Sequence, residues 1–151
     1  MRKLTPEAVR IVDAPNIAHL ATLMPDGAPK VEPVWIGRDG DLLLVATDAK
    51  SLKARNVGND ARVGLSIASE DNPYEQLLIR GTVSEIRADD DLAVLDALSL
   101  KYLGAPFARR RWSARVVLVI RADVVRHYVS PLRRPTPGHA PTPTTSPEAP
   151  T

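Results

Sequence analysis

The stretch IAHLATLMPDGAPKVEPVWI, residues 17–36, holds two apolar segments separated by a strong turn sequence. Between the segments, Pro25 fixes its own φ and Gly27 can adopt a positive φ, a combination typical of tight turns. We therefore expect residues 17–23 and 30–36 to form an antiparallel hairpin.

Four more strands are expected after this hairpin. The sequence GRDGD makes a second tight turn before the apolar run LLLVA, so we expect the second and third strands to pair antiparallel as part of a meander. The strands that follow the hairpin are expected at residues 42–46, 61–68, 77–86 and 114–120. Six strands with mostly hairpin connections favour a small closed antiparallel barrel over an open sheet.

Short helices are expected around these strands. The first follows Thr5, a good N-cap, and starts at Pro6, which suits the first helical position. The second is a short helix within residues 47–57. The third follows the acidic run at residues 89–91 and stops at Gly104, because acids favour a helix N-terminus and glycine a C-terminus. The fold class is therefore mainly β with short helices.

Composition limits the classes of function. At 151 residues the chain suits one domain. Its 20 basic and 18 acidic residues nearly cancel, so charge does not indicate nucleic-acid binding. Without cysteine there is no disulfide or thiolate, and the three histidines lack metal-ligand spacing, so we expect no metal. With no signal-peptide region and no apolar run near the roughly 18 residues of a membrane span, we expect a cytoplasmic protein.

The C-terminal end differs in composition from the rest of the chain. Residues 131–151 read PLRRPTPGHAPTPTTSPEAPT and contain almost none of the large apolar residues needed for burial. Such a segment cannot offset the entropy of its own ordering. We expect a folded domain at residues 1–130 and a disordered tail, rich in proline and threonine, at residues 131–151.

The segment TDAKSLKARN, residues 47–56, follows an apolar strand and returns to an apolar run. It presents the hydroxyls of Thr47 and Ser51 together with two lysines and an arginine. Taken alone, this composition fits either a solvated surface loop with a short helix or an anion-binding site.

The anion-site interpretation rests on the expected helix N-terminus and on the spacing of the two lysines. If Thr47 or Asp48 caps the short helix, the backbone N–H groups of residues 49–51 form its anion-binding end. Lys50 and Lys53 are three residues apart and fall near one helix face. A carboxylate at position 48 would repel a phosphate unless it is occupied as a cap.

Three stretches carry a family likeness: residues 17–36, TDAKSLKARNVGNDARVGLSI, and DNPYEQLLIRGTVSEI followed by an acidic helix. In this order they resemble the pyridoxamine 5'-phosphate oxidase-like split β-barrel superfamily. The chain is most similar to its actinobacterial branch, which uses the deazaflavin cofactor F420. The likeness spans about residues 5–130 and includes RVVLVIRADVVRHY as the closing strand.

This resemblance implies a six-stranded antiparallel split β-barrel of the FMN-binding-protein type, and a homodimer with two cofactor sites at the subunit interface. It implies that the segment after the third strand binds phosphate, with Lys53 and Asn56 matching the family pattern best. It also implies that the middle of the second strand runs along the flavin-like ring. The cofactor-binding residues expected on these grounds are Pro33, Val34, Trp35, Thr47, Lys50, Ser51, Lys53, Arg55 and Asn56.

Several residues keep two interpretations. Trp35 alone also suits a core or dimer-interface position, and Arg55 is expected either to pair with an acid or to reach a second part of the ligand. Glu32 departs from the family pattern, and we expect it to face solvent. The arginines at residues 109–111 suit either the oligoglutamate tail of F420 or a solvated turn, and Tyr74 is a candidate to border the site across the dimer.

The function implied by the resemblance is an F420-dependent oxidoreductase that transfers a hydride between F420 and a small unsaturated or quinone-like substrate. No catalytic side chain is assigned, because in such enzymes the cofactor carries the chemistry. Two alternatives stay open: an FMN-binding enzyme like pyridoxamine phosphate oxidase, and a carrier that binds F420 or a flavin without turnover.

Overall fold

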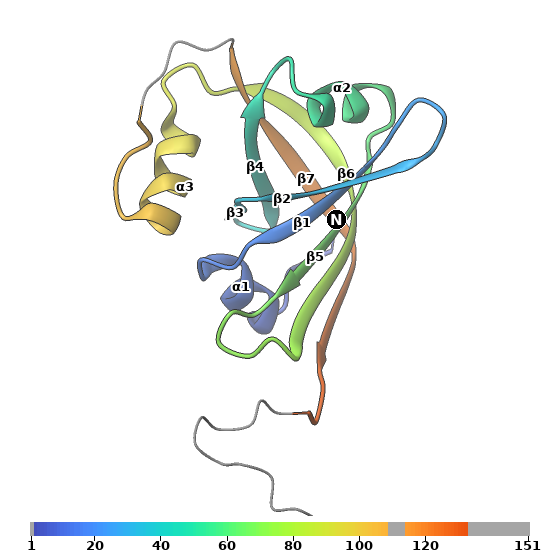
Figure 1. Ribbon diagram of the computed structural model, residues 1–151, viewed down its shortest axis with the longest axis vertical. Coiled ribbons are helices and arrows are strands. Elements are labelled where there is room, and N and C mark those ends of the chain that lie inside the picture. Colours follow the sequence, from blue (N-terminus) through green and yellow to red (C-terminus); the bar gives the residue numbers. More distant parts are fainter. Residues whose placement is uncertain (1, 109–113, 133–151) are drawn as a thin grey trace, which may run out of the picture.

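The computed structural model describes residues 2–108 and 114–132. Within this part the protein is mainly β, with a seven-stranded sheet and three short helices (Figure 1). The strands are β1 (Ala18–Leu23), β2 (Pro29–Val34), β3 (Gly37–Asp39), β4 (Leu42–Asp48), β5 (Arg62–Ala68), β6 (Glu75–Ala88) and β7 (Arg115–Val129). The helices are α1 (Pro6–Asp13), α2 (Leu52–Asn59) and α3 (Ala93–Leu103).

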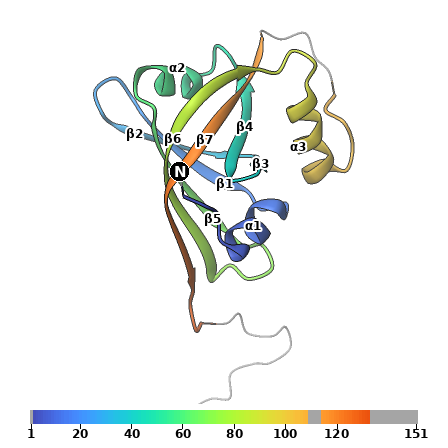
Figure 2. The ribbon, with the colours of Figure 1, turned by 180° about the vertical axis from the view of Figure 1, so that it is seen from behind.

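The strand order across the sheet is β2-β1-β5-β6-β7-β4-β3, and every neighbouring pair is antiparallel. The two edge strands, β2 and β3, are consecutive in the chain and are joined only by Trp35 and Ile36. Three Cα–Cα steps of about 3.8 Å cannot span more than about 11 Å, so the two edges must approach each other. The sheet is therefore strongly curled. The long strands β6 and β7 run side by side in the view from behind (Figure 2).

The hairpin of β1 and β2 confirms the first sequence prediction, but the predicted meander is wrong. The sheet does not pair β2 with β4; β4 pairs with β3 and β7 instead. The chain breaks its strand at Trp35 and Ile36, and Ile36 becomes completely buried. Gly40, with φ of 59°, then turns the short strand β3 back onto β4. Because β3 is a separate strand, the described sheet has seven strands rather than six, and its hydrogen-bond order is not closed.

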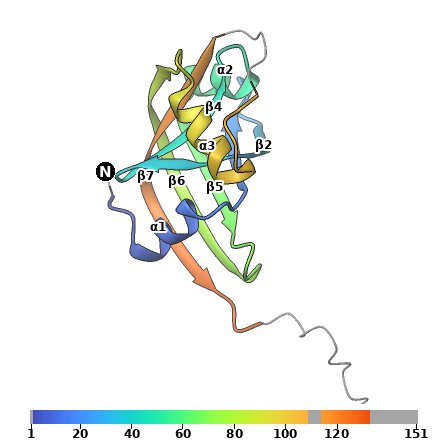
Figure 3. The same cartoon turned by 90° about the vertical axis from the view of Figure 1, so that its left-hand side faces the viewer.

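The main core fills the concave side of this curled sheet. Helix α1 lies against it (Figure 3), and its residues Ile11 and Val12 are fully buried with Leu20 and Leu43 of the sheet. The predicted start of α1 is confirmed, because the Thr5 side chain accepts a hydrogen bond from the N–H of Ala8 at 3.2 Å.

A second, smaller apolar cluster lies on strands β4 and β7. It contains Leu44, Val117 and Val119, and Val94 of α3 packs against it. These residues alternate along the strands with Leu43 and other members of the main core, so both faces of β4 and β7 carry apolar residues. Helix α3 therefore packs outside the sheet, beside β4 (Figure 1).

The ends of α3 match the sequence prediction. The Asp89 carboxylate accepts hydrogen bonds from the N–H groups of Val94 at 3.1 Å and Leu95 at 3.0 Å. The helix ends at Gly104, whose φ of 75° is the left-handed conformation that glycine adopts at little cost.

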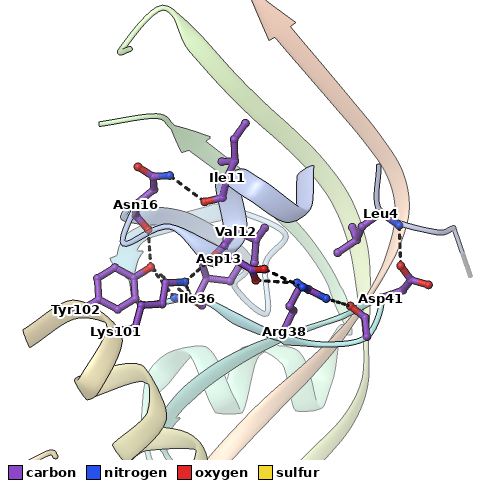
Figure 4. A network of polar contacts seen from close by, with 11 residues as sticks. Leu4, Ile11, Val12, Asp13, Asn16, Ile36, Arg38, Asp41, Lys101 and Tyr102 are labelled. Carbon is purple, nitrogen blue, oxygen red and sulfur yellow. Dashed lines mark hydrogen bonds and ion pairs between the residues drawn. The ribbon is translucent and has the colours of Figure 1, made fainter. Parts of the chain in front are cut away.

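Polar contacts tie α3 to the first third of the chain (Figure 4). The Lys101 Nζ donates to the carbonyls of Val12 and Ile36. The Tyr102 hydroxyl donates to the carbonyl of Asn16 at 2.5 Å. Burial lowers the pKa of Lys101 to about 8. These contacts fix α3 next to the connection between β2 and β3.

Candidate functional site

A pocket of about 570 Å³ lies where β2, β4, the start of α2 and α3 meet. Six of the nine predicted site residues line it: Pro33, Val34, Trp35, Thr47, Ser51 and Lys53. The structure adds further lining residues that the sequence did not indicate: Ile17, Ala46, Leu95, Leu98, Phe107 and Arg115. Asp48 completes the lining.

The polar end of the pocket is a chain of side-chain contacts. The Lys53 Nζ donates to Thr47 Oγ1 at 3.2 Å, and Thr47 Oγ1 donates to Ser51 Oγ at 3.0 Å. Ser51 in turn accepts from the N–H of Ala54 at 3.2 Å and is the N-cap of α2. The ammonium and the two hydroxyls are thereby held together at the start of the helix.

The predicted cap at Thr47 or Asp48 is wrong, because α2 begins one turn later with Ser51 as its cap. The N–H groups of Lys50 and Ser51 donate to the side chain and the carbonyl of Asp48, at 2.7 Å and 2.9 Å. The N–H of Ala49 donates to the Ala114 carbonyl at 2.8 Å. These three groups are used internally, so the predicted anion-binding end at residues 49–51 is wrong.

The prediction that Glu32 faces solvent is wrong, because its side chain is only 27% exposed. Its carboxylate lies between two ammonium groups, 2.8 Å from Lys53 Nζ and 2.6 Å from Lys30 Nζ. Burial raises the pKa of Glu32, but hydrogen bonds from the two lysines lower it more, so the net pKa lies below the ordinary value of 4.5. Glu32 is therefore ionised at neutral pH beside the predicted phosphate ligand.

The apolar side of the pocket is formed by Pro33 and Val34 of β2 and by Trp35, which follows this strand. The indole of Trp35 stacks on Tyr102, with ring centroids 5.3 Å apart and an interplanar angle of 5°. Phe107 meets the indole edge-on, at 6.3 Å and 80°. These two ring contacts hold the indole of Trp35 in one orientation. Trp35 is half-buried and lines the pocket.

Arg115, at the start of β7, is a pocket residue that sequence reasoning missed. It is half-buried, and this burial lowers its pKa, while Asp48 and Asp89 act in the opposite direction. Its position follows from the pairing of β7 with β4, which places Arg115 opposite Asp48. The sequence contains no local signal for this pairing, because the two residues come from strands far apart in the chain.

Three predicted site residues do not line the pocket. Lys50 and Arg55 are exposed. Asn56 is only 1% exposed, and its side-chain NH₂ donates to Thr22 Oγ1 at 3.1 Å and contacts Met24 Sδ at 3.4 Å. The structure thus places Asn56 in the contact between α2 and β1.

The remaining candidate residues, and two of the three histidines, lie outside the pocket or outside the described residues. His19 is exposed on β1, and Tyr74 precedes β6 without lining the pocket. The arginines at residues 109–111, His139 and the tail from residue 133 lie outside the described residues. Within residues 2–108 and 114–132, no group of three or more His, Cys, Asp or Glu could hold a metal ion. None of the helices in that same part has the length and apolar composition to span a bilayer.

The family model for pyridoxamine 5'-phosphate oxidase matches residues 4–128, so the chain belongs to this family. The family predicted from the sequence is therefore confirmed. The chain matches no curated protein significantly.

Solved structures extend this comparison. An F420 reductase is 30% identical, with a TM-score of 0.74 over 82% of this chain and 98% of that one. This similarity supports the F420 branch of the family. A conserved hypothetical protein from Mycobacterium tuberculosis is 24% identical, with a TM-score of 0.67 over 84% and 86% of the two chains. General stress protein 26 from Bacillus anthracis is 21% identical, with a TM-score of 0.61 over 78% and 88%. The last two share the fold.

Proposed function

We propose that this protein is an F420-dependent oxidoreductase that acts on a small unsaturated or quinone-like substrate. The observation that carries the proposal is the two-sided pocket, in which a cationic, hydroxyl-lined end adjoins a flat apolar wall. The similarity to an F420 reductase supports the same cofactor.

The residues of the pocket fit a phosphorylated, ring-containing cofactor. Lys53 supplies a charge-assisted donor, and Thr47 and Ser51 add hydroxyls for a phosphate. Pro33, Val34 and Trp35 supply the apolar surface for a ring system. Asp48 is held as a turn acceptor for the N–H of Lys50, which lowers its repulsion toward a phosphate.

When bound, reduced F420 supplies a hydride from its deazaflavin ring. The protein's own residues then hold the phosphate, orient the ring and limit access of water. Leu95, Leu98 and Phe107 form the apolar wall on the α3 side and are suited to exclude water from the reacting atoms. No side chain of the pocket is required to act as an acid or base in this proposal.

We also propose that the protein functions as a homodimer whose partner completes the pocket. Ile17 lines the pocket but remains 41% exposed, and Val31 on the same hairpin is 60% exposed. Apolar residues exposed next to a ligand pocket are suited to be covered by a second copy.

FMN is the second candidate cofactor, because the family model that matches the chain is that of pyridoxamine 5'-phosphate oxidase. FMN offers a phosphate and a planar ring to the same two sides of the pocket. The two cofactors can be told apart by titrating the purified protein separately with F420 and FMN and following absorbance and fluorescence.

Oxidation of reduced F420 should then be followed with a panel of quinones and activated alkenes. F420 binding with turnover supports the proposal, and binding without turnover on any acceptor indicates a carrier. Binding of FMN alone would overturn the choice of cofactor. Binding of neither would overturn the site.

A further inference from the structure

Glu32 is the acidic partner of the lysine proposed to bind phosphate. Its Oε1 lies 2.8 Å from Lys53 Nζ, and its Oε2 lies 2.6 Å from Lys30 Nζ. The side chains are 27% exposed for Glu32, 27% for Lys30 and 17% for Lys53. Charges this far removed from water are screened less than those of an exposed ion pair.

The geometry around Lys53 places Glu32 close to any anion that this lysine binds. An ammonium has three donors. In the described part of the chain, the Lys53 ammonium donates to Thr47 Oγ1 at 3.2 Å and lies 2.8 Å from Glu32 Oε1 in an ion pair. An anion that accepts a hydrogen bond of about 2.9 Å from the same ammonium has its oxygen within about 6 Å of Glu32 Oε1. A carboxylate and a phosphate would then share one ammonium.

We propose that Glu32 determines which phosphate charge this subsite accepts, favouring a phosphodiester with one negative charge over a phosphate monoester with nearly two. The inference rests on the proposed function, because it assumes that Lys53 holds the phosphate. Repulsion between charges within about 6 Å of each other grows in proportion to the charge of the ligand. A monoester carries about 1.5 to 2 negative charges at neutral pH. Glu32 therefore penalises the monoester about twice as strongly.

The matched ligands are riboflavin, the monomethyl phosphate ester of FMN, and FMN. They share one ring system and carry no phosphate, one negative charge and nearly two negative charges. Glu32→Gln should leave riboflavin affinity unchanged, tighten the methyl ester roughly fivefold, and tighten FMN roughly twenty-five-fold, since each charge contributes a similar factor. The measurement is the quenching of flavin fluorescence at fixed pH and salt.

Two variants act as controls. Lys30→Gln removes the cation on the far side of the carboxylate and keeps Glu32, so it should weaken FMN more than riboflavin. Glu32→Ala removes the same charge without leaving an amide, so it must rank the three ligands in the same order as Glu32→Gln. Thermal melting of each variant shows that the comparison is made on folded protein.

Equal effects of Glu32→Gln on all three ligands, or weaker FMN binding, would overturn the inference. If the wild type binds F420 but no flavin, Glu32→Gln must gain FMN binding, and its failure to do so also overturns the inference. Neither result affects the proposed function. Loss of the proposed function is recognised separately: F420 and FMN affinities that do not change in Lys53→Ala, or an absence of binding to F420 and every flavin, would remove the phosphate subsite and this inference with it.

Discussion

The indole of Trp35 lies parallel to the phenol ring of Tyr102, with an interplanar angle of 5°. The Tyr102 hydroxyl is itself fixed by the backbone, because it donates to the Asn16 carbonyl at 2.5 Å and accepts from the Ile36 N–H at 3.2 Å. Burial raises the pKa of Tyr102, so the hydroxyl keeps its proton at neutral pH. One tyrosine thus joins the pocket wall to α3 and to both ends of the first hairpin.

Tyr102→Phe should destabilise the protein while leaving the ring stack in place. The variant removes one hydroxyl that serves the backbone of Asn16 and Ile36, so we expect a loss of about 1 to 3 kcal/mol in the free energy of unfolding. Urea denaturation measures it. Tyr128→Phe, at a position that is 53% exposed, is the control and should change little. Equal stabilities of the two variants would show that the hydroxyl contacts contribute nothing.

The sequence was sufficient for the features that depend on local patterns. The turn around Gly27, the cap at Thr5 and the stop at Gly104 each use a residue whose backbone preference acts within a few positions. The hairpin of β1 and β2 follows from the same turn.

The sequence was insufficient to predict the features that depend on pairing between strands far apart in the chain. The turn at Gly40 was expected to pair the second and third strands, but β2 and β4 lie apart in the strand order because the chain leaves β2 at Trp35 and Ile36. Arg115 reaches the pocket only through the pairing of β7 with β4. Neither arrangement can be predicted from a local sequence pattern, since both depend on which strands become neighbours in the folded sheet.

Asn56 was expected to bind the cofactor because it matches the family pattern, but it does not line the pocket. Because its amide is buried and bonded to Thr22, Asn56→Ala should lower the free energy of unfolding by about 1 to 3 kcal/mol. Cofactor affinity of the folded variant should be nearly unchanged, since Asn56 does not line the pocket. Chemical denaturation and a cofactor titration on the same preparation test both statements. A large loss of affinity at unchanged stability would return Asn56 to the cofactor site.

If the protein is a homodimer, its molar mass in solution should be twice that of one chain. Its interface should bury upwards of about 2,000 Å², as obligate dimers do. Light scattering at micromolar concentration, with and without F420, tests this directly. Because Ile17 and the pocket would be covered by the partner, cofactor affinity should fall on dilution below the dimer dissociation constant. A monomer that binds F420 with full affinity would contradict the shared site.

Glu75 connects α1 to the ends of β6 and β7 and should make stability depend on pH. Hydrogen bonds from Arg10 and from His127, whose Nε2 lies 2.8 Å from Glu75 Oε1, hold the pKa of Glu75 below its ordinary value of 4.5. A carboxyl whose pKa is lower in the folded state stabilises the fold above the unfolded pKa, and this contribution is lost as pH falls through the folded pKa.

Glu75→Gln should therefore be less stable than the wild type at pH 7, and the difference should shrink as pH falls below about 4.5. Urea denaturation of both proteins at several pH values between 7 and 3 measures the difference. Asp123→Asn is the comparison: the pKa of this carboxyl of β7 is also lowered, mainly by Thr82, but the residue is exposed, so a smaller difference from the wild type is expected at every pH. A difference between wild type and Glu75→Gln that is constant over the whole range would contradict the role of the charge.

Lys53 and Lys50 offer the most direct test of the phosphate site, because they are two lysines of one short segment with different surroundings. Lys53 lines the pocket and is 17% exposed, whereas Lys50 is exposed and lies outside the lining. Lys53→Ala should weaken F420 binding by about 1.5 to 3 kcal/mol, the usual size of a charge-assisted hydrogen bond. Lys50→Ala changes the net charge equally and is the matched control, for which little loss is expected. The loss in Lys53→Ala should shrink as salt rises, because screening already weakens the wild-type contact. Fluorescence titrations at two salt concentrations measure the F420 affinity of all three proteins. Equal affinities for wild type and Lys53→Ala would show that the phosphate does not bind at this end of the pocket.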